Sequence, residues 1–190
     1  MANSNYLSVE SDCIDAHGRR SDLPARRGFT LVEILIVVAV ILIASMLALP
    51  MLSSAGDMQV RSAANMVMAD LEYAKSMAIT KGQNYSVVFD ATNESYEIVD
   101  QNGNTIAHPV KKGFSYVISF SSDGRLDKVD VTTVDFDPGS NTTITFDYLG
   151  SPYSGSGTAS PLSSAQIILQ ADTTTMTIQV EPVTGYVSIL

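Results

Sequence analysis

The sequence has only one cysteine and two histidines among its 190 residues. A single cysteine, Cys13, can form no disulfide bond within the chain, and Cys/His zinc sites are excluded. His17 and His108 each lack the partners, at a suitable spacing, of a catalytic triad. A glycine-rich phosphate-binding loop is also absent. The sequence therefore indicates no enzyme, and it predicts no cofactor, no bound metal and no small-molecule substrate.

Basic residues are few as well. The chain has 11 Lys and Arg against 20 Asp and Glu, and after Gly28 only 7 basic residues remain against 16 acidic ones. Residues 165–190 contain no Lys or Arg, and Lys111 and Lys112 are the only basic pair after the N-terminal region. Because nucleic-acid binding draws its affinity from clustered Lys and Arg, we expect no nucleic-acid partner.

One long apolar run is present, from Phe29 to Leu49, and Glu33 is its only charged residue. As a helix it would be about 32 Å long, which is enough to cross a bilayer. Four arginines precede the run and only Arg61 follows it closely, which predicts a cytoplasmic N-terminus and an external C-terminal domain. A removable secretory signal is the alternative, but its apolar core is shorter, about 7 to 15 residues.

The stretch RRGFTLVEILIVVAVILIASMLALP, which begins at Arg26, resembles the N-terminal signal of type IV pilins and type II secretion pseudopilins. In that family a prepilin peptidase cuts after the glycine and methylates the new N-terminal amine. The resemblance implies a cut between Gly28 and Phe29, with Arg26 and Arg27 as the basic residues of the leader.

The same resemblance gives Glu33 a role in assembly. It implies that Glu33 pairs with the α-amine of Phe29 on a neighbouring subunit, because a carboxylate and an ammonium neutralise each other in a dry helix bundle. The alternative is that Glu33 lies in the headgroup region and benefits from the positive end of the helix dipole. Pro50 matches the helix-kinking proline of the family, although a proline can also mark the end of a helix.

A helical pattern continues beyond Pro50 as far as Lys81 and Gly82, which resemble a helix stop. Apolar residues recur there at alternating spacings of four and three, which predicts an amphipathic helix. The residues of this stripe are Val60, Ala64, Val67, Leu71, Ala74 and Ala78.

About eight short β-rich runs follow, separated by turn residues, and GFSYVISF, residues 113–120, is one of them. The sequence thus predicts an α+β fold of the pilin type, in which a long N-terminal helix packs on an antiparallel β-rich head of two small sheets. Residues 151–164, rich in Ser, Gly and Pro, are expected to form an exposed mobile loop. The expected segments are a leader at 1–28, a membrane and filament-core helix at 29–50, an amphipathic helix at 51–81 and a periplasmic head at 82–190.

The end of the helix, "ITFDYLGSP" and "VEPVTGYVSI" resemble the GspH/FimT type of minor pseudopilin. The resemblance implies a non-enzymatic subunit of the type II secretion pseudopilus, which is held in the inner membrane before assembly. Its implied partners are the prepilin peptidase, other pseudopilins or pilins, the inner-membrane assembly platform and the lipid bilayer. Minor pilins of type IV pili are the close alternative, and DNA-uptake minor pilins are a more distant one.

Calcium is a further alternative for the head, because five aspartates lie between residues 123 and 137. They do not follow the spacing of a calcium-binding loop. Solvated strand ends and turns explain them more simply.

Overall fold

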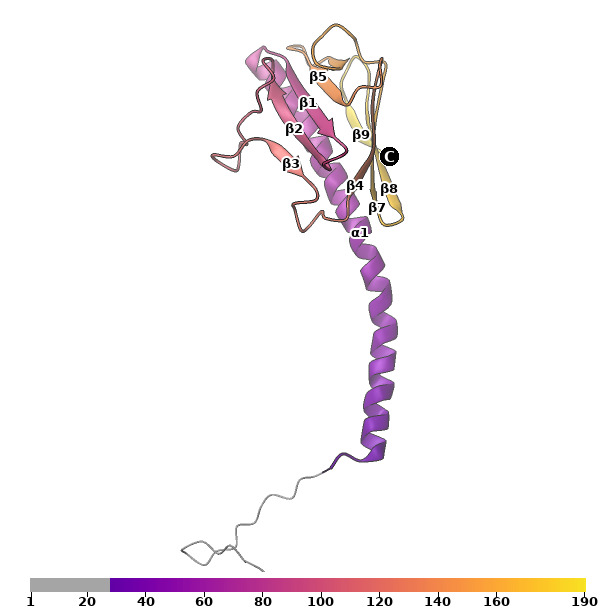
Figure 1. Ribbon diagram of the computed structural model, residues 1–190. Coiled ribbons are helices and arrows are strands. Elements are labelled where there is room, and N and C mark those ends of the chain that lie inside the picture. The colour runs from indigo at the N-terminus through magenta and orange to yellow at the C-terminus, as the bar shows by residue number, and fades with distance from the viewer. Residues whose placement is uncertain (1–27) are drawn as a thin grey trace, which may run out of the picture. The chain divides into compact units, whose positions relative to one another are not determined.

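The computed structural model describes residues 28–190, apart from the side chains of residues 46–54. The chain divides into two compact units, Met1–Ala44 and Ser45–Leu190. Its one long helix begins in the first unit and ends in the second. One helix and nine strands are assigned in the described part (Figure 1). They are α1 (Leu31–Lys81), β1 (Tyr85–Asp90), β2 (Ser95–Asp100), β3 (Val117–Ser119), β4 (Asp130–Asp137), β5 (Thr143–Phe146), β6 (Pro152–Ser154), β7 (Ser164–Ala171), β8 (Thr174–Val180) and β9 (Val187–Ile189).

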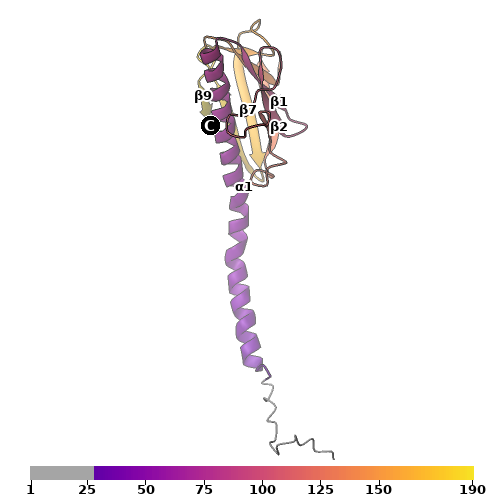
Figure 2. The ribbon, with the colours of Figure 1, turned by 90° about the vertical axis from the view of Figure 1, so that its left-hand side faces the viewer.

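The strands form two antiparallel sheets in the second unit, which we call the head. One sheet has the order β3-β2-β1-β5-β6 and the other has the order β4-β7-β8-β9. Figures 1 and 2 show the C-terminal half of α1 running alongside both sheets. The predicted α+β fold, with a long helix packed on two small antiparallel sheets, is confirmed.

One hydrophobic core joins the helix to both sheets. All six residues of the predicted apolar stripe on α1 have an exposure of 0 %. Three of the six are alanines, whose small side chains let the helix lie close to the strands. Every buried apolar side chain that the structure describes lies between Val60 and Val187, so the head has a core of its own.

The predicted end of the helix is also confirmed. Gly82 adopts a left-handed conformation with φ of 65°, and the Gln83 N–H donates to the carbonyl oxygen of Ala78 at 3.2 Å. This bond closes the last turn in the manner of a Schellman motif, in which glycine is favoured because it has no Cβ. The chain then reverses into β1.

The predicted number of strands was too low, because β6 lies in the segment expected to be a mobile loop. The Ser154 hydroxyl donates to the carbonyl oxygen of Phe136 at 2.6 Å, and both Pro152 and Leu162 are buried. The Leu162 N–H also donates to the Pro152 carbonyl oxygen at 3.1 Å. The exposure predicted from composition is therefore wrong for Pro152, Ser154 and Leu162, while residues 158–159 and 163–164 are exposed as predicted.

A second correction concerns residues 113–120, which were predicted to form one strand. Only β3 is a strand there. The Tyr116 N–H donates to the carbonyl oxygen of Ile106 at 2.7 Å, and the His108 N–H donates to that of Phe114 at 2.9 Å. The first half of the segment therefore closes a hairpin with residues 106–108.

Candidate functional site

The first candidate site is the N-terminal stretch from Gly28 to residue 45. Gly28, Phe29 and Thr30 precede α1, and the Phe29 side chain is 78 % exposed. A Cβ atom added at Gly28 would have no described atom within 4 Å, so folding gives no steric reason for a glycine at this position.

Glu33 lies in the first turn of α1. Its backbone N–H donates to the Thr30 hydroxyl at 3.2 Å, and the Ile34 N–H donates to the Thr30 carbonyl oxygen at 3.2 Å. Thr30 is thus the N-cap, and Glu33 occupies the third helical position, as in a capping box. A carboxylate here is also favoured by the positive end of the helix dipole.

The helix that follows is apolar on all its sides. Its large apolar side chains between Leu31 and Ile43 are 49 % to 81 % exposed. A helix of this kind requires an apolar environment around it, and within the first unit nothing described supplies one. The feature that defines this site is therefore an exposed apolar surface with one carboxylate at its start.

Among the residues that the structure describes, no helical stretch is both long enough and apolar enough to cross a membrane.

Three of the residues singled out in the sequence lie at the limits of the structure. Arg26 and Arg27 are outside the described residues. Pro50 lies within the bounds of α1, but its side chain is not described, so the kink stays a prediction.

In the head, a buried carboxylate forms a cluster that the sequence analysis missed. Asp70 on α1 is 8 % exposed and accepts hydrogen bonds from the hydroxyls of Tyr96 at 2.5 Å and Tyr116 at 2.8 Å. The Tyr116 ring stacks between His108, with centroids 4.6 Å apart, and Tyr73, with centroids 5.5 Å apart. The cluster ties the helix to the first sheet and to the hairpin beside it.

The electrostatics of the cluster follow from its burial. Burial raises the pKa of the Asp70 carboxyl, while the tyrosine hydrogen bonds and His108 act in the opposite direction. Burial, together with the nearby carboxylate, also raises the pKa of the Tyr96 and Tyr116 hydroxyls, so both remain protonated donors. Asp70 is the acceptor that both hydroxyls require.

We expect Asp70 to make the head less stable as the pH rises. Its pKa is about 3.8 in the unfolded chain and higher in the folded head. Between these two values the folded state holds a proton that the unfolded state has released, so raising the pH through this window favours unfolding. Each unit of difference between the two pKa values corresponds to about 1.4 kcal/mol of unfolding free energy.

The measurement is urea unfolding of the wild type and Asp70→Asn across this window, followed by tyrosine fluorescence. The sequence has no tryptophan, and all tyrosines except Tyr6 lie in the head. Carboxyls with a lowered pKa, such as Asp123, lose their stabilising effect at low pH in both proteins and so cancel in the difference. A difference between the two proteins that does not change with pH would contradict the prediction.

Of the remaining candidates of the sequence analysis, His108 belongs to this cluster. The Nδ1 atom of His108 accepts hydrogen bonds from the backbone N–H groups of Val110 and Lys111, both at 3.1 Å, which fixes the ring in a turn. Among the described residues, no group of three or more His, Cys, Asp or Glu side chains could hold a metal ion. Lys111 and Lys112 lie together in the same turn.

Comparison with known proteins matches two family models. The model described as type II transport protein GspH matches residues 63–184, and the model of the prokaryotic N-terminal methylation motif matches residues 23–49. The first match covers most of the head and the second covers the first candidate site. Comparison with curated protein sequences gave no match.

Three solved structures resemble the chain. The minor pseudopilin EpsH of the Vibrio cholerae type 2 secretion system is 11 % identical with a TM-score of 0.48, and the match covers 70 % of this chain and 96 % of EpsH. The Pseudomonas aeruginosa type IV minor pilin FimU, in its P65 crystal form, is 15 % identical with a TM-score of 0.44, covering 68 % and 91 % of the two chains. Its P21 form gives 16 % identity and a TM-score of 0.43, covering 69 % and 86 %.

Proposed function

The chain belongs to the GspH family of type II transport proteins, and from this premise we propose that it is a minor pseudopilin, a structural subunit of a type II secretion pseudopilus. In this role it would support protein export across the outer membrane without catalysing a reaction. The type II transport family model favours secretion over the close alternative, a minor pilin of a type IV pilus.

The single observation that carries the proposal is the contrast between the two units. The head buries its own core from Val60 onward, whereas the large apolar side chains from Leu31 to Ile43 are at least 49 % exposed. A surface of this kind is satisfied by lipid before assembly and by other apolar helices afterwards. Moving from one apolar environment to the other costs little hydrophobic free energy, which suits a subunit that is stored in the membrane and then polymerised.

The methylation motif supports processing by a prepilin peptidase. We propose that residues 1–28 are removed between Gly28 and Phe29, that Phe29 is N-methylated, and that residues 29–50 form the membrane and filament-core helix. Arg26 and Arg27 would hold the leader on the cytoplasmic side of the inner membrane. The amphipathic part of α1 and residues 82–190 would then lie in the periplasm.

In the assembled filament we expect other pilins or pseudopilins to surround α1, with Glu33 beside the α-amine of a neighbouring Phe29. Delivery to the filament would require the inner-membrane assembly platform, since the sequence contains no nucleotide-binding loop of its own. Pro50 would allow the helix to bend between its two halves.

Mass spectrometry of the protein, produced together with a prepilin peptidase, tests this proposal. We expect a chain that begins at Phe29 and carries one added methyl group. The variant Gly28→Val is expected to keep its leader, and because no described atom lies within 4 Å of the added Cβ, its head should fold as in the wild type.

A wild-type protein that retains residues 1–28, or one that is released as a soluble monomer after cleavage behind the apolar run, would overturn the proposal. Production without the peptidase provides the matched control for the cut. Equal folding of the two proteins, measured by near-ultraviolet circular dichroism of the tyrosines, shows that a lost cut is not a consequence of misfolding.

A further inference from the structure

A cleft of about 460 Å³ opens in the surface of the head. Its walls come from α1, from the turn at residues 108–111, from β3 and from the turn at residues 122–125. The family match assigns no role to this cleft. It lies entirely within the second unit and is separate from the first candidate site.

The floor of the cleft is held in place by the Asp70 cluster. The Tyr116 ring, which borders the cleft, is fixed by its hydrogen bond to Asp70 and by stacking against His108 and Tyr73. The His108 ring is fixed in turn by the two backbone N–H groups that donate to its Nδ1 atom. A surface with so few free rotamers loses little entropy when it binds a partner.

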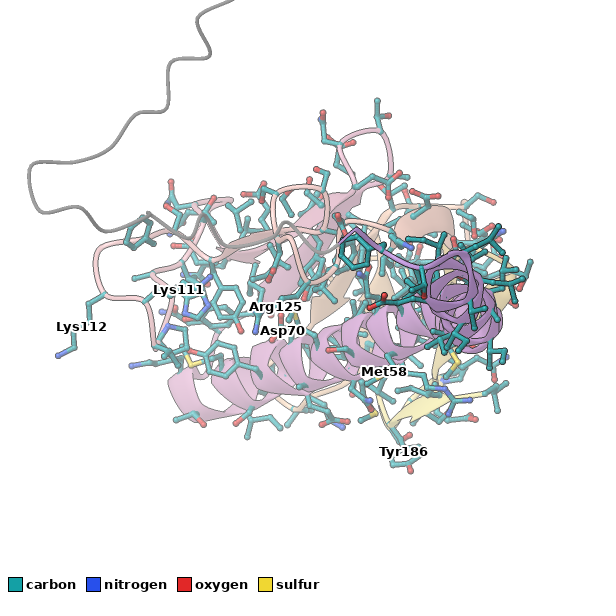
Figure 3. All side chains as sticks on the ribbon, turned by 90° about the horizontal axis from the view of Figure 1, so that it is seen from below. Met58, Asp70, Lys111, Lys112, Arg125 and Tyr186 are labelled. Atoms are coloured by element: carbon teal, nitrogen blue, oxygen red, sulfur yellow. The ribbon has the colours of Figure 1, made fainter. Side chains whose placement is uncertain are left out.

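Positive charge gathers at this cleft although the head as a whole is acidic. Lys111 and Arg125 line it, which are two of the seven basic residues after Gly28, and Lys112 follows Lys111 directly in the chain. Figure 3 shows Lys111 and Arg125 on the same side of α1 as Asp70, with Lys112 pointing away from the head.

The three basic side chains differ in their pairing. Arg125 donates to both carboxylate oxygens of Asp123, at 3.1 and 2.8 Å, and this pair lowers the pKa of Asp123 to about 2. Lys111 and Lys112 form no ion pair with any residue that the structure describes. The cleft therefore has one ammonium group without an ion pair, that of Lys111, beside a guanidinium that is already fixed in position.

Apolar side chains flank these charges. Val110 is 83 % exposed, Phe114 is 68 % exposed and Val117 is 50 % exposed. Val117 belongs to β3, which is the edge strand of its sheet and has no neighbouring strand on its outer side within residues 28–190. An exposed aromatic beside unpaired basic groups at a sheet edge is typical of a protein-binding surface.

We propose that this cleft binds a segment of another protein in which a carboxylate side chain stands next to an apolar one. The carboxylate lies against Lys111, with Lys112 adding positive charge from the next position in the chain, and the apolar side chain packs on Phe114 and Val117. The head as a whole is acidic and repels a long phosphate backbone more than it repels a single carboxylate beside Lys111, so a nucleic acid is not the preferred occupant. A small inorganic anion is not the preferred occupant either, because it would leave the apolar side chains of this surface uncovered.

This binding site goes beyond the proposed function. It concerns the head alone and depends neither on the cut after Gly28 nor on the entry of α1 into a filament. Its failure is therefore distinguishable from failure of the proposed processing.

Binding is tested with the full chain in detergent micelles and two short rhodamine-labelled peptides, read by fluorescence anisotropy. Both peptides alternate valine or phenylalanine with a charged residue, which is aspartate in one and lysine in the other. We expect the aspartate peptide to bind and the lysine peptide not to bind. The double variant Lys111→Glu, Lys112→Glu should weaken binding at least about tenfold, because it places like charges against the ligand. Phe114→Ser should weaken it about fivefold or more through the loss of an apolar anchor.

The matched control is the double variant Lys81→Glu, Lys128→Glu, which makes the same change of net charge elsewhere on the head. It should change the affinity no more than about twofold, since exposed distant charges are screened by salt. The proposal is overturned if the control weakens binding as much as the cleft variant, or if the lysine peptide binds equally well. Tighter binding of a single-stranded oligonucleotide, or no binding of the aspartate peptide, also overturns it.

Discussion

Replacing Glu33 by alanine is expected to abolish incorporation of the subunit into filaments while leaving membrane insertion and leader removal intact. Once the chain begins at Phe29, its α-amine is a positive charge at the end of an apolar helix. In a helix bundle an ammonium without its carboxylate costs about 3–5 kcal/mol, which lowers the assembly equilibrium more than about a hundredfold. Insertion into lipid should become easier, because a charged residue has been removed from an apolar helix.

Two further variants separate the charge of Glu33 from its capping role. Glu33→Gln keeps a side chain that is suited to the third position of a capping box but removes the charge. Thr30→Ala removes the hydroxyl that accepts the Glu33 N–H, yet keeps the charge. We expect Glu33→Gln to fail like Glu33→Ala and Thr30→Ala to assemble, when sheared filaments are collected by centrifugation and the subunit is quantified. Normal assembly of Glu33→Gln would show that the proposed pairing with the α-amine is wrong.

The N-terminal candidate site could be predicted from the sequence because the residues that define it are neighbours in the chain. Gly28, Phe29 and Glu33 lie within six consecutive residues, and an apolar run follows at once. The stripe on the C-terminal half of α1 was accessible for a related reason. Its apolar residues recur with the helical period in consecutive turns, and the folded head buries the helix face that this period marks.

The Asp70 cluster could not be predicted in the same way. A carboxylate next to Leu71 on an amphipathic helix is expected to point toward water. Asp70 is buried only because hydrogen-bond donors from other elements are there to satisfy it. The hydroxyls that hydrogen-bond to it belong to residues 26 and 46 positions later in the chain, on β2 and just before β3. Partners of this kind are set by the pairing of strands, which a local pattern does not record. β6 was missed for the same reason, since its Ser154 contact lies 18 residues away, on Phe136.

The Asp70 cluster should also carry a large share of the stability of the head. Tyr96→Phe removes the hydroxyl that donates to Asp70 at 2.5 Å and leaves one buried carboxylate oxygen without that donor. A hydrogen bond to a charged group contributes about 1.5–3 kcal/mol, so we expect a loss of about 2–3 kcal/mol in the free energy of unfolding. Urea unfolding of the full chain, followed by the remaining tyrosines of the head, measures this loss.

A double-mutant cycle with Asp70→Leu shows whether the loss belongs to this pair. In the Asp70→Leu background the Tyr96 hydroxyl has already lost its acceptor, so Tyr96→Phe should cost less than about 1 kcal/mol or should stabilise the head. The double variant places two apolar side chains in contact within the core, which is the arrangement that often replaces a buried charged pair without loss. Tyr85→Phe is the matched control, because Tyr85 is also buried but lies outside the Asp70 cluster. Equal costs of Tyr96→Phe in both backgrounds would mean that the helix and the sheet are joined by apolar packing alone, and that Asp70 is tolerated in the core instead of stabilising it.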